Sequence, residues 1–141
     1  MIKEVEKIPD VNGKKSQRKQ IREDLTEALE KGIKMFEFTG DAYNYKTLQA
    51  AAGSEARWLT YTRLKAAFFK ARPDLRKFHP HVYCGWIKVH SRRDGDTRRV
   101  FCEITPEEFD KALKAMIAKA EATRDARKER DARKEREEAR K

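Results

Sequence analysis

Apolar residues recur at helical spacing in three segments of the chain. In the first, Ile21, Leu25 and Leu29 fall on one face, which is the pattern of an amphipathic helix. Ser16 stands where an N-cap residue would accept a backbone hydrogen bond, and Gly32 stands where a left-handed residue would end the helix. The sequence therefore predicts a helix between these two residues.

The second helical segment extends over residues 44–71 and stops before Pro73, which disfavours helical backbone in the residue that precedes it. Gly53 and Ser54 interrupt this segment. Two interpretations stay open: one helix with a weak point, or two helices joined by a tight turn. The third segment begins at Thr105, with proline in its first turn, and loses its apolar stripe after residue 120.

Residues rich in β-branched and aromatic side chains form shorter segments at 33–38, 82–92 and 97–105. The last two flank Asp94 and Gly95, and Asp-Gly between such segments is the strongest short hairpin signal. The sequence therefore predicts a strand at 33–38 and a hairpin whose two turn residues are Asp94 and Gly95.

This turn would give the hairpin two faces of opposite character. The apolar face contains Gly85, Ile87, Val89, Val100, Cys102 and Ile104. The other face combines cations with two large rings, and contains Cys84, Trp86, Lys88, His90, Arg92, Thr97, Arg99, Phe101, Glu103 and Thr105.

Together these elements predict an α+β fold, a small mixed or antiparallel sheet with a C-terminal hairpin packed on two or three helices. Residues 2–8 are an expected edge strand or arm, and residues 1–120 an expected single domain. Residues 121–141 are highly charged and repeat Asp-Ala-Arg-Lys-Glu-Arg. A six-residue period builds no coiled-coil seam, so we expect a helical or frayed tail supported by pairs such as Glu129 with Arg133.

The net charge of +10 is concentrated in one stretch of the chain. Residues 57–99 hold twelve Lys or Arg, three acidic residues, both tryptophans and all three histidines, and they carry +9. Lysine and arginine neutralise phosphates while aromatic rings stack on bases, so this composition is typical of nucleic-acid binding.

The candidate binding residues form two groups within this stretch. The first group comes from the second helical segment and the residues after it: Arg57, Arg63, Lys65, Lys70, Arg72, Arg76 and Lys77. The second group comes from the hairpin: Trp86, Lys88, His90, Arg92, Arg93, Arg98, Arg99 and Phe101. For Trp86 and Phe101 the competing interpretation is that a helix packs over both rings.

If Gly53 breaks the second segment, the two resulting helices would resemble a DNA-binding helix-turn-helix motif. The residues that would then face DNA are Arg57, Thr60, Tyr61 and Arg63. Gln49 counts against this interpretation, since such motifs prefer a small residue four positions before the glycine.

His79, His81 and Cys84 are close enough in sequence to suggest a metal site, but two imidazoles alone do not make one, and no carboxylate accompanies them. No phosphate-binding loop, nucleophile elbow or paired-carboxylate motif occurs. We therefore expect no cofactor, no metal and no enzymatic activity. Both cysteines are expected as reduced core residues, and no apolar stretch suits a membrane, so we expect a protein of the bacterial cytoplasm.

The order strand, helix, strand, helix and basic hairpin, with Tyr45-Lys46-Thr47-Leu48 opening the second helix and the sequence VYCGWIKV at 82–89, resembles small accessory proteins of phages and conjugative elements of Gram-positive gut bacteria. Such proteins include inhibitors of CRISPR nucleases and small gene regulators. The resemblance implies a non-catalytic protein that binds DNA, RNA or a nucleoprotein complex such as an RNA-guided nuclease, with an anti-CRISPR inhibitor as the narrower hypothesis. The alternatives are a helix-turn-helix transcription regulator that acts as a dimer, and a structural RNA-associated protein whose basic residues only raise non-specific affinity.

Overall fold

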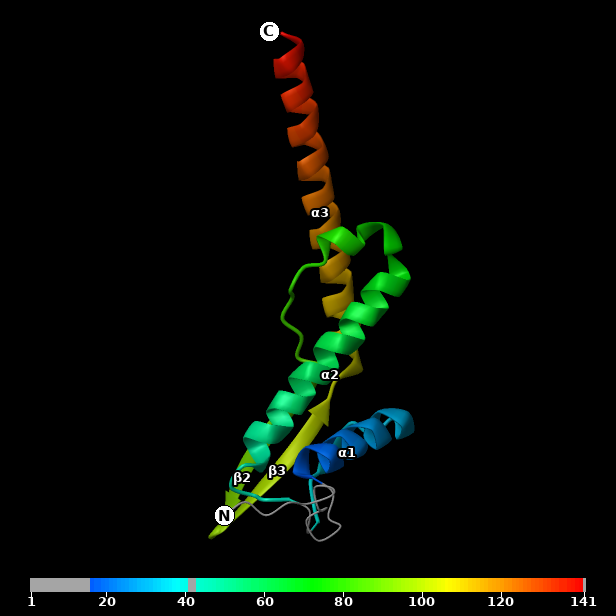
Figure 1. The fold of residues 1–141 in the computed structure, drawn as a ribbon. Helices are drawn as coiled ribbons and strands as arrows, with labels where there is room; N and C mark the ends of the chain where they lie inside the picture. The colour runs from blue at the N-terminus through cyan, green and yellow to red at the C-terminus, as the bar shows by residue number, and fades with distance from the viewer. Residues whose placement is uncertain (1–15, 41–42, 141) are drawn as a thin grey trace, which may run out of the picture. The chain divides into compact units, whose positions relative to one another are not determined.

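A computed structural model of the chain describes residues 16–40 and 43–140 (Figure 1). It confirms the mixed α+β class, and its three-stranded antiparallel sheet has the strand order β1-β3-β2. The elements are α1 (Gln17–Lys31), β1 (Met35–Glu37), α2 (Leu48–Ala71), the 3-10 helix η2 (Pro73–Phe78), β2 (Ile87–Asp94), β3 (Thr97–Ile104) and α3 (Pro106–Ala139). The strand or arm expected at 2–8 lies outside the described residues. No helix in the described ranges has the length and apolar content to cross a bilayer.

The chain divides into two compact units. The first unit comprises Met1–Glu55 and Val89–Cys102, and the second comprises Ala56–Lys88 and Glu103–Lys141. Helix α2 and strands β2 and β3 each contribute residues to both units. The expectation of one domain over residues 1–120 stays a prediction.

Helix α1 in the first unit has the two caps that the sequence predicts. The Ser16 hydroxyl accepts a hydrogen bond from the Lys19 backbone N–H at 3.2 Å. Gly32 adopts φ = +68°, and the backbone N–H of Ile33 donates to the Ala28 carbonyl at 2.9 Å. This left-handed cap uses Ile33 to close the helix, so β1 begins two residues later than the sequence suggests.

Helix α2 continues through Gly53 without a break, so the interpretation as two helices is wrong. A glycine inside a helix costs about 0.5–1 kcal/mol relative to alanine, and the surrounding contacts exceed this cost. Leu48, Ala52 and Ala56 are buried on one face of the helix. The helix also begins at Leu48 and not at residue 44, because the Asn44 side chain accepts the Lys46 N–H and forms a turn of its own.

Strands β2 and β3 are joined by Gly95 and Asp96, one residue later than predicted. Gly95 takes the left-handed φ of +62° at the first turn position, while Asp94 remains in its strand. The Thr105 N–H accordingly donates to the Trp86 carbonyl at 2.7 Å. Each residue of β2 is therefore opposite a residue of β3 that lies two positions later than predicted. Because this shift is even, every side chain stays on its predicted face of the hairpin.

The core of the second unit forms around the first half of α3. Its buried residues are Leu64, Phe68, Leu75, Ala112, Met116 and Ala120. Thr105 occupies the cap position of α3, but its side chain makes no capping hydrogen bond. The helix nevertheless runs on to Ala139 as one element (Figure 1). Beyond Ala120 it is almost entirely exposed, and the predicted pair of Glu129 with Arg133 forms at 3.6 Å.

Candidate nucleic-acid interface

Residues 56–88 of the second unit hold eight Lys or Arg and one acidic residue, Asp74. They form most of α2, all of η2 and the segment that leads to β2. The exposed cations are Arg57, Arg63, Lys70, Arg76, Lys77 and Lys88, while Lys65 and Arg72 are partly buried. Every predicted basic residue of the first candidate group therefore reaches the surface of one unit.

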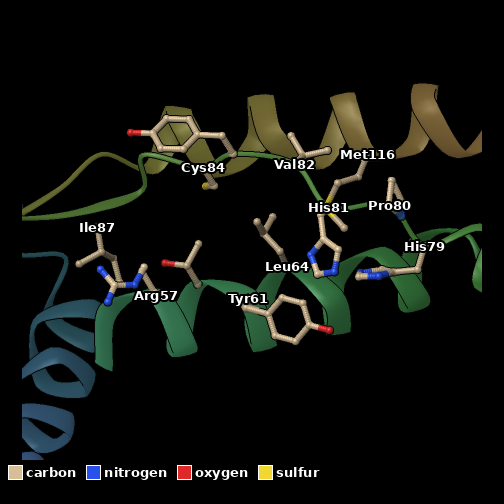
Figure 2. Close-up of a pocket in the computed structure, with 12 residues that line it drawn as sticks. Arg57, Tyr61, Leu64, His79, Pro80, His81, Val82, Cys84, Ile87 and Met116 are labelled. Carbon is tan, nitrogen blue, oxygen red and sulfur yellow. The ribbon is translucent and has the colours of Figure 1, made fainter. Parts of the chain in front are cut away.

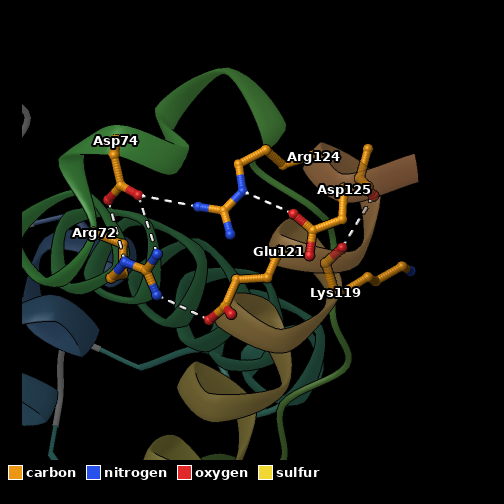
Figure 3. Close-up of polar contacts among 7 residues, drawn as sticks. Arg72, Asp74, Lys119, Glu121, Arg124 and Asp125 are labelled. Atoms are coloured by element: carbon orange, nitrogen blue, oxygen red, sulfur yellow. Dashed lines mark hydrogen bonds and ion pairs between the residues drawn. The ribbon is translucent and has the colours of Figure 1, made fainter. Parts of the chain in front are cut away.

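Arg72 differs from its neighbours because carboxylates surround it (Figure 3). Its guanidinium donates to both oxygens of Asp74, at 3.1 and 3.0 Å, and to Glu121 of α3 at 2.8 Å. Arg124 adds a contact to Asp74 at 3.4 Å. The Arg72 hydrogen bonds lower the pKa of Asp74, which stays ionised. Arg72 thus fastens η2 to α3 and is a structural residue more than a binding residue.

The other cations of α2 and η2 are not neutralised in this way. Among the described residues, none forms an ion pair with Arg57, Arg63, Lys70 or Lys77. Lys65 lies over aromatic rings, with its ammonium 5.7 Å from the ring centre of Tyr61. These positive charges are therefore available to a polyanion.

Three large aromatic rings of the second unit are exposed among these cations. Trp58 is 56% exposed, Tyr61 is 42% exposed and Tyr83 is 84% exposed. Large rings are usually buried in a monomer, where each stabilises the fold by removing apolar surface from water. Their exposure beside lysine and arginine is the arrangement found on surfaces that stack bases.

Two of the rings line a cavity of about 240 Å³ between α2, α3 and residues 79–84 (Figure 2). Its lining residues are Arg57, Thr60, Tyr61, Leu64, His79, Pro80, His81, Val82, Tyr83, Cys84, Ile87 and Met116. All of them belong to the second unit. Figure 2 shows Leu64 of α2 and Met116 of α3 on its apolar side, with the rings of Tyr61 and His81 next to each other.

The two histidines of the cavity have different surroundings. His81 is exposed and stacks on Tyr61, with ring centres 5.6 Å apart and an interplanar angle of 18°. His79 packs edge-on against Phe68 at 5.4 Å and Phe69 at 5.5 Å. Its buried Nε2 atom has no hydrogen-bond partner. Burial, followed by the charges of Lys65 and His81, lowers the pKa of His79, so its imidazole is mainly neutral at pH 7.

These histidines do not form a metal site in the described part of the chain. No cluster there brings together three His, Cys, Asp or Glu side chains, which a bound ion would need. The Cys84 thiol instead contacts the Glu108 carbonyl oxygen at 3.6 Å, and burial raises its pKa. Cys84 is a free thiol, and Cys102 is fully buried.

Trp86 does not present its ring to solvent, which corrects the prediction for the hairpin. It is only 8% exposed, and its ring centre lies 4.7 Å from that of Phe109 in α3. A helix therefore packs over this ring, as in the competing interpretation. Phe101 is partly buried and is covered by the Arg99 guanidinium, which lies 5.1 Å from its ring centre.

The hairpin cations also differ among themselves. Arg99 donates two hydrogen bonds of 2.8 Å to Glu37 of β1, which lowers the pKa of Glu37 and neutralises both charges. His90 is partly buried and has a partner in the structure. Arg92, Arg93 and Arg98 are exposed near the turn, and none of the described aromatic rings of the first unit is exposed.

The sequence indicated Trp86 and Phe101 as exposed rings, whereas the exposed rings are Trp58, Tyr61 and Tyr83, of which the two tyrosines line the cavity. The sequence signal for the exposure of Tyr83 is Pro80, because a proline between two histidines keeps residues 79–83 out of a strand.

Comparison of the chain with protein-family models, with curated proteins and with solved structures gives no match.

Proposed function

We propose that this protein binds nucleic acid without catalysis, through a surface of the second unit that we call the α2–η2 surface. Its members are Arg57, Tyr61, Arg63, Lys65, Lys70, Arg76, Lys77 and Tyr83. The observation that carries the proposal is the exposure of two tyrosine rings among cations that have no acidic partner in the described chain.

The cations and the exposed rings of this surface have separate roles in binding. Each lysine or arginine that meets a phosphate releases condensed counterions, which makes affinity fall steeply with salt. Each exposed ring can stack on an unpaired base and contributes about 1–3 kcal/mol, whatever the base. Because rings stack only on accessible base faces, the proposal favours single strands or loops over a continuous duplex.

The proposal is non-catalytic because the cavity groups suit binding better than proton or group transfer. No carboxylate lines the cavity among the described residues. Burial raises the pKa of the Cys84 thiol, which disfavours the reactive thiolate. The His79 imidazole has no carboxylate orienting it, a partner that general bases commonly use.

The helix-turn-helix alternative is not retained, because α2 is a single helix through Gly53 and contains no turn. The anti-CRISPR hypothesis is a narrower form of the present proposal. It requires the α2–η2 surface to bind guide RNA, target DNA or an acidic surface of an RNA-guided nuclease. Its own test is whether the protein blocks target cleavage by a guide-loaded nuclease and stays bound to that complex.

The experiment for the broader proposal measures binding of the full chain to three fluorescent 20-nucleotide probes: single-stranded DNA, single-stranded RNA and a duplex. Anisotropy is recorded from low to moderate salt. We expect tighter binding to the single strands, with log K falling linearly with log salt at a slope near −0.7 per phosphate contact. Heparin is the control polyanion without bases. Equal affinity for heparin and single strands at matched charge contradicts a role for the rings.

A further inference from the structure

The cavity beside Tyr61 has three properties that together point to a ligand. Leu64, Ile87 and Met116 are buried residues that give it an apolar interior. Tyr61 and His81 are exposed and stacked, so planar side chains stand at its opening. An apolar interior with planar side chains at the entrance suits a flat, ring-shaped group.

His79, which lines the cavity, has a buried polar atom without a partner. The Nε2 atom of His79 is buried and makes no hydrogen bond, which costs about 1–3 kcal/mol for a buried polar group. Phe68 and Phe69 hold the ring edge-on. A neutral imidazole can donate or accept one hydrogen bond at this atom. The His79 imidazole therefore holds an unused hydrogen-bonding atom next to the cavity.

The cavity also has a positively charged edge. Arg57 is one of its lining residues, and Lys65 lies 5.7 Å from the ring centre of Tyr61. Lys88 lies in the same region. A Cβ atom added to Gly85 would be within 4 Å of both the Lys88 Nζ atom and the hydroxyl of Tyr83, which lines the cavity. A ligand with a flat ring and an adjacent anionic group matches this edge.

We propose that the cavity holds one unstacked nucleobase of a single strand, while Arg57, Lys65 and Lys88 contact the phosphates next to it. This inference rests on the proposed function and names the group that the same surface recognises. The volume of about 240 Å³ equals that of roughly eight water molecules at about 30 Å³ each. It is below the range of about 300–1,000 Å³ typical of drug-sized ligands, which favours a single base.

The decisive experiment follows the imidazole C–H signals of the full chain by NMR. The chain has three histidines, so His79 and His81 report on the cavity, while His90 belongs to β2 of the first unit and serves as the internal reference. The probes are the four ribonucleoside 5′-monophosphates, with ribose 5-phosphate as the control that lacks a base. We expect saturable shifts of His79 and His81 with at least one nucleotide, and no such shifts with ribose 5-phosphate.

A cavity-filling variant links these shifts to the strand. Val82→Trp places a ring in the cavity and leaves every cation in place, and Val82→Phe is a smaller second variant. Ala118→Trp is the matched control, because Ala118 is exposed on α3 and does not line the cavity. We expect the filled variants to bind single strands about 10-fold more weakly than wild type, with duplex affinity unchanged within about twofold, since one lost stacked base is worth at least about 1.4 kcal/mol.

The outcomes separate this inference from the function on which it rests. If single strands bind with the expected salt dependence but no nucleotide moves the His79 and His81 signals, the base-binding cavity is refuted and the proposed function stands. Equal shifts with ribose 5-phosphate refute it as well, because the phosphate alone would then be recognised. If wild-type protein binds neither strands nor duplex, the proposed function fails, and this inference fails with it.

Discussion

The ion pairs of the first unit and the cations of residues 56–88 in the second unit differ in how their charges are used. In the first unit, carboxylates are matched with cations: Glu55 accepts hydrogen bonds from Arg22 at 2.7 Å and Arg18 at 3.2 Å, and Glu37 is matched with Arg99. In residues 56–88 of the second unit the one acidic side chain, Asp74, is already occupied by Arg72. The remaining cations of that stretch surround exposed rings.

This difference shows what each set of charges does for the molecule. Paired charges in the first unit fix α1 to α2 and β1 to β3, so they act on the fold. Unneutralised cations repel one another and disfavour the compact state unless a polyanion is bound. Net charge per unit therefore says less about binding than the number of cations that lack a carboxylate.

Removing a core ring from the first unit should cost stability without removing the binding surface. Phe38 is fully buried and contacts Tyr43 edge-on at 5.8 Å. Phe38→Ala should lower the free energy of unfolding by about 3–5 kcal/mol, because it leaves a cavity. Urea denaturation measures this loss. Phe38→Leu is the control and should cost considerably less.

The same variant tests whether the first unit takes part in nucleic-acid binding. At low temperature, where the folded fraction of Phe38→Ala is still high, its affinity for single strands should match wild type within about threefold, or about 0.65 kcal/mol. A loss of binding that exceeds the unfolded fraction would mean that the first unit takes part in recognition.

Neutralising the cations of the second unit should have the next largest effect, this time on affinity. The quadruple variant replaces Arg57, Arg63, Lys70 and Lys77 with glutamine. If each meets one phosphate, the slope of log K against log salt should become less negative by about 3, since each contact on a single strand contributes about 0.7. At about 0.1 M salt we expect roughly 100-fold weaker binding, or about 2.7 kcal/mol.

The matched control neutralises the hairpin cations of the first unit, Arg92, Arg93 and Arg98. These three arginines are exposed, but none of the described aromatic rings of the first unit is exposed. We expect no more than about a 10-fold loss from this variant, or about 1.4 kcal/mol. If the hairpin variant loses more affinity than the α2 and η2 variant, the contrast between the units is reversed.

Glu55 offers a test of the paired charges through pH. It is 3% exposed, and hydrogen bonds from Arg22, supported by Arg18, hold its pKa below 4.5 although burial alone would raise it. Glu55→Gln should cost about 2 kcal/mol at neutral pH, because hydrogen bonds to a charged group contribute about 1.5–3 kcal/mol. Thermal unfolding of both proteins measures the difference.

The sign of the pH dependence follows from the lowered pKa. A carboxyl whose pKa is lower in the folded than in the unfolded chain contributes stability that is complete above the unfolded value. This contribution disappears as the pH falls through the lower, folded value. The stability difference between wild type and Glu55→Gln should therefore be constant near neutral pH and shrink below about 4.5. Glu30→Gln, at an exposed position of α1, is the control, and an equal effect there would contradict the assignment.

Local chemistry explains which parts of the fold the sequence could predict. The caps of α1 depend on Ser16 and Gly32 alone, and the end of α2 depends on Pro73, so these boundaries follow from neighbours in the chain. Whether Gly53 interrupts α2 could not be predicted from its neighbours in the chain. The contacts that keep its helix intact, including the bonds of Glu55 to Arg22, join residues more than thirty positions apart.

The candidate site was predictable in composition and not in placement. The concentration of cations and rings in residues 57–99 is a property of the sequence. Whether a ring is buried depends on which element covers it, and Phe109 of α3 covers Trp86. Tyr83 lies only three residues earlier, yet it is the most exposed large ring in the described chain.

The smallest effect is predicted for a variant that removes the acidic partner of a cation in the first unit. Glu37→Gln removes the carboxylate that accepts two bonds from Arg99, a partly exposed pair whose loss should cost about 0.5 kcal/mol of stability. Arg99 would then be available to phosphates, so single-strand affinity should rise about twofold, or about 0.4 kcal/mol. Glu107→Gln on α3 removes the same charge from an exposed position and controls for the change in net charge. Equal gains from both variants would show that affinity follows net charge. A gain confined to Glu37→Gln would show that the ion pair with Glu37 keeps Arg99 of the first unit from binding phosphates.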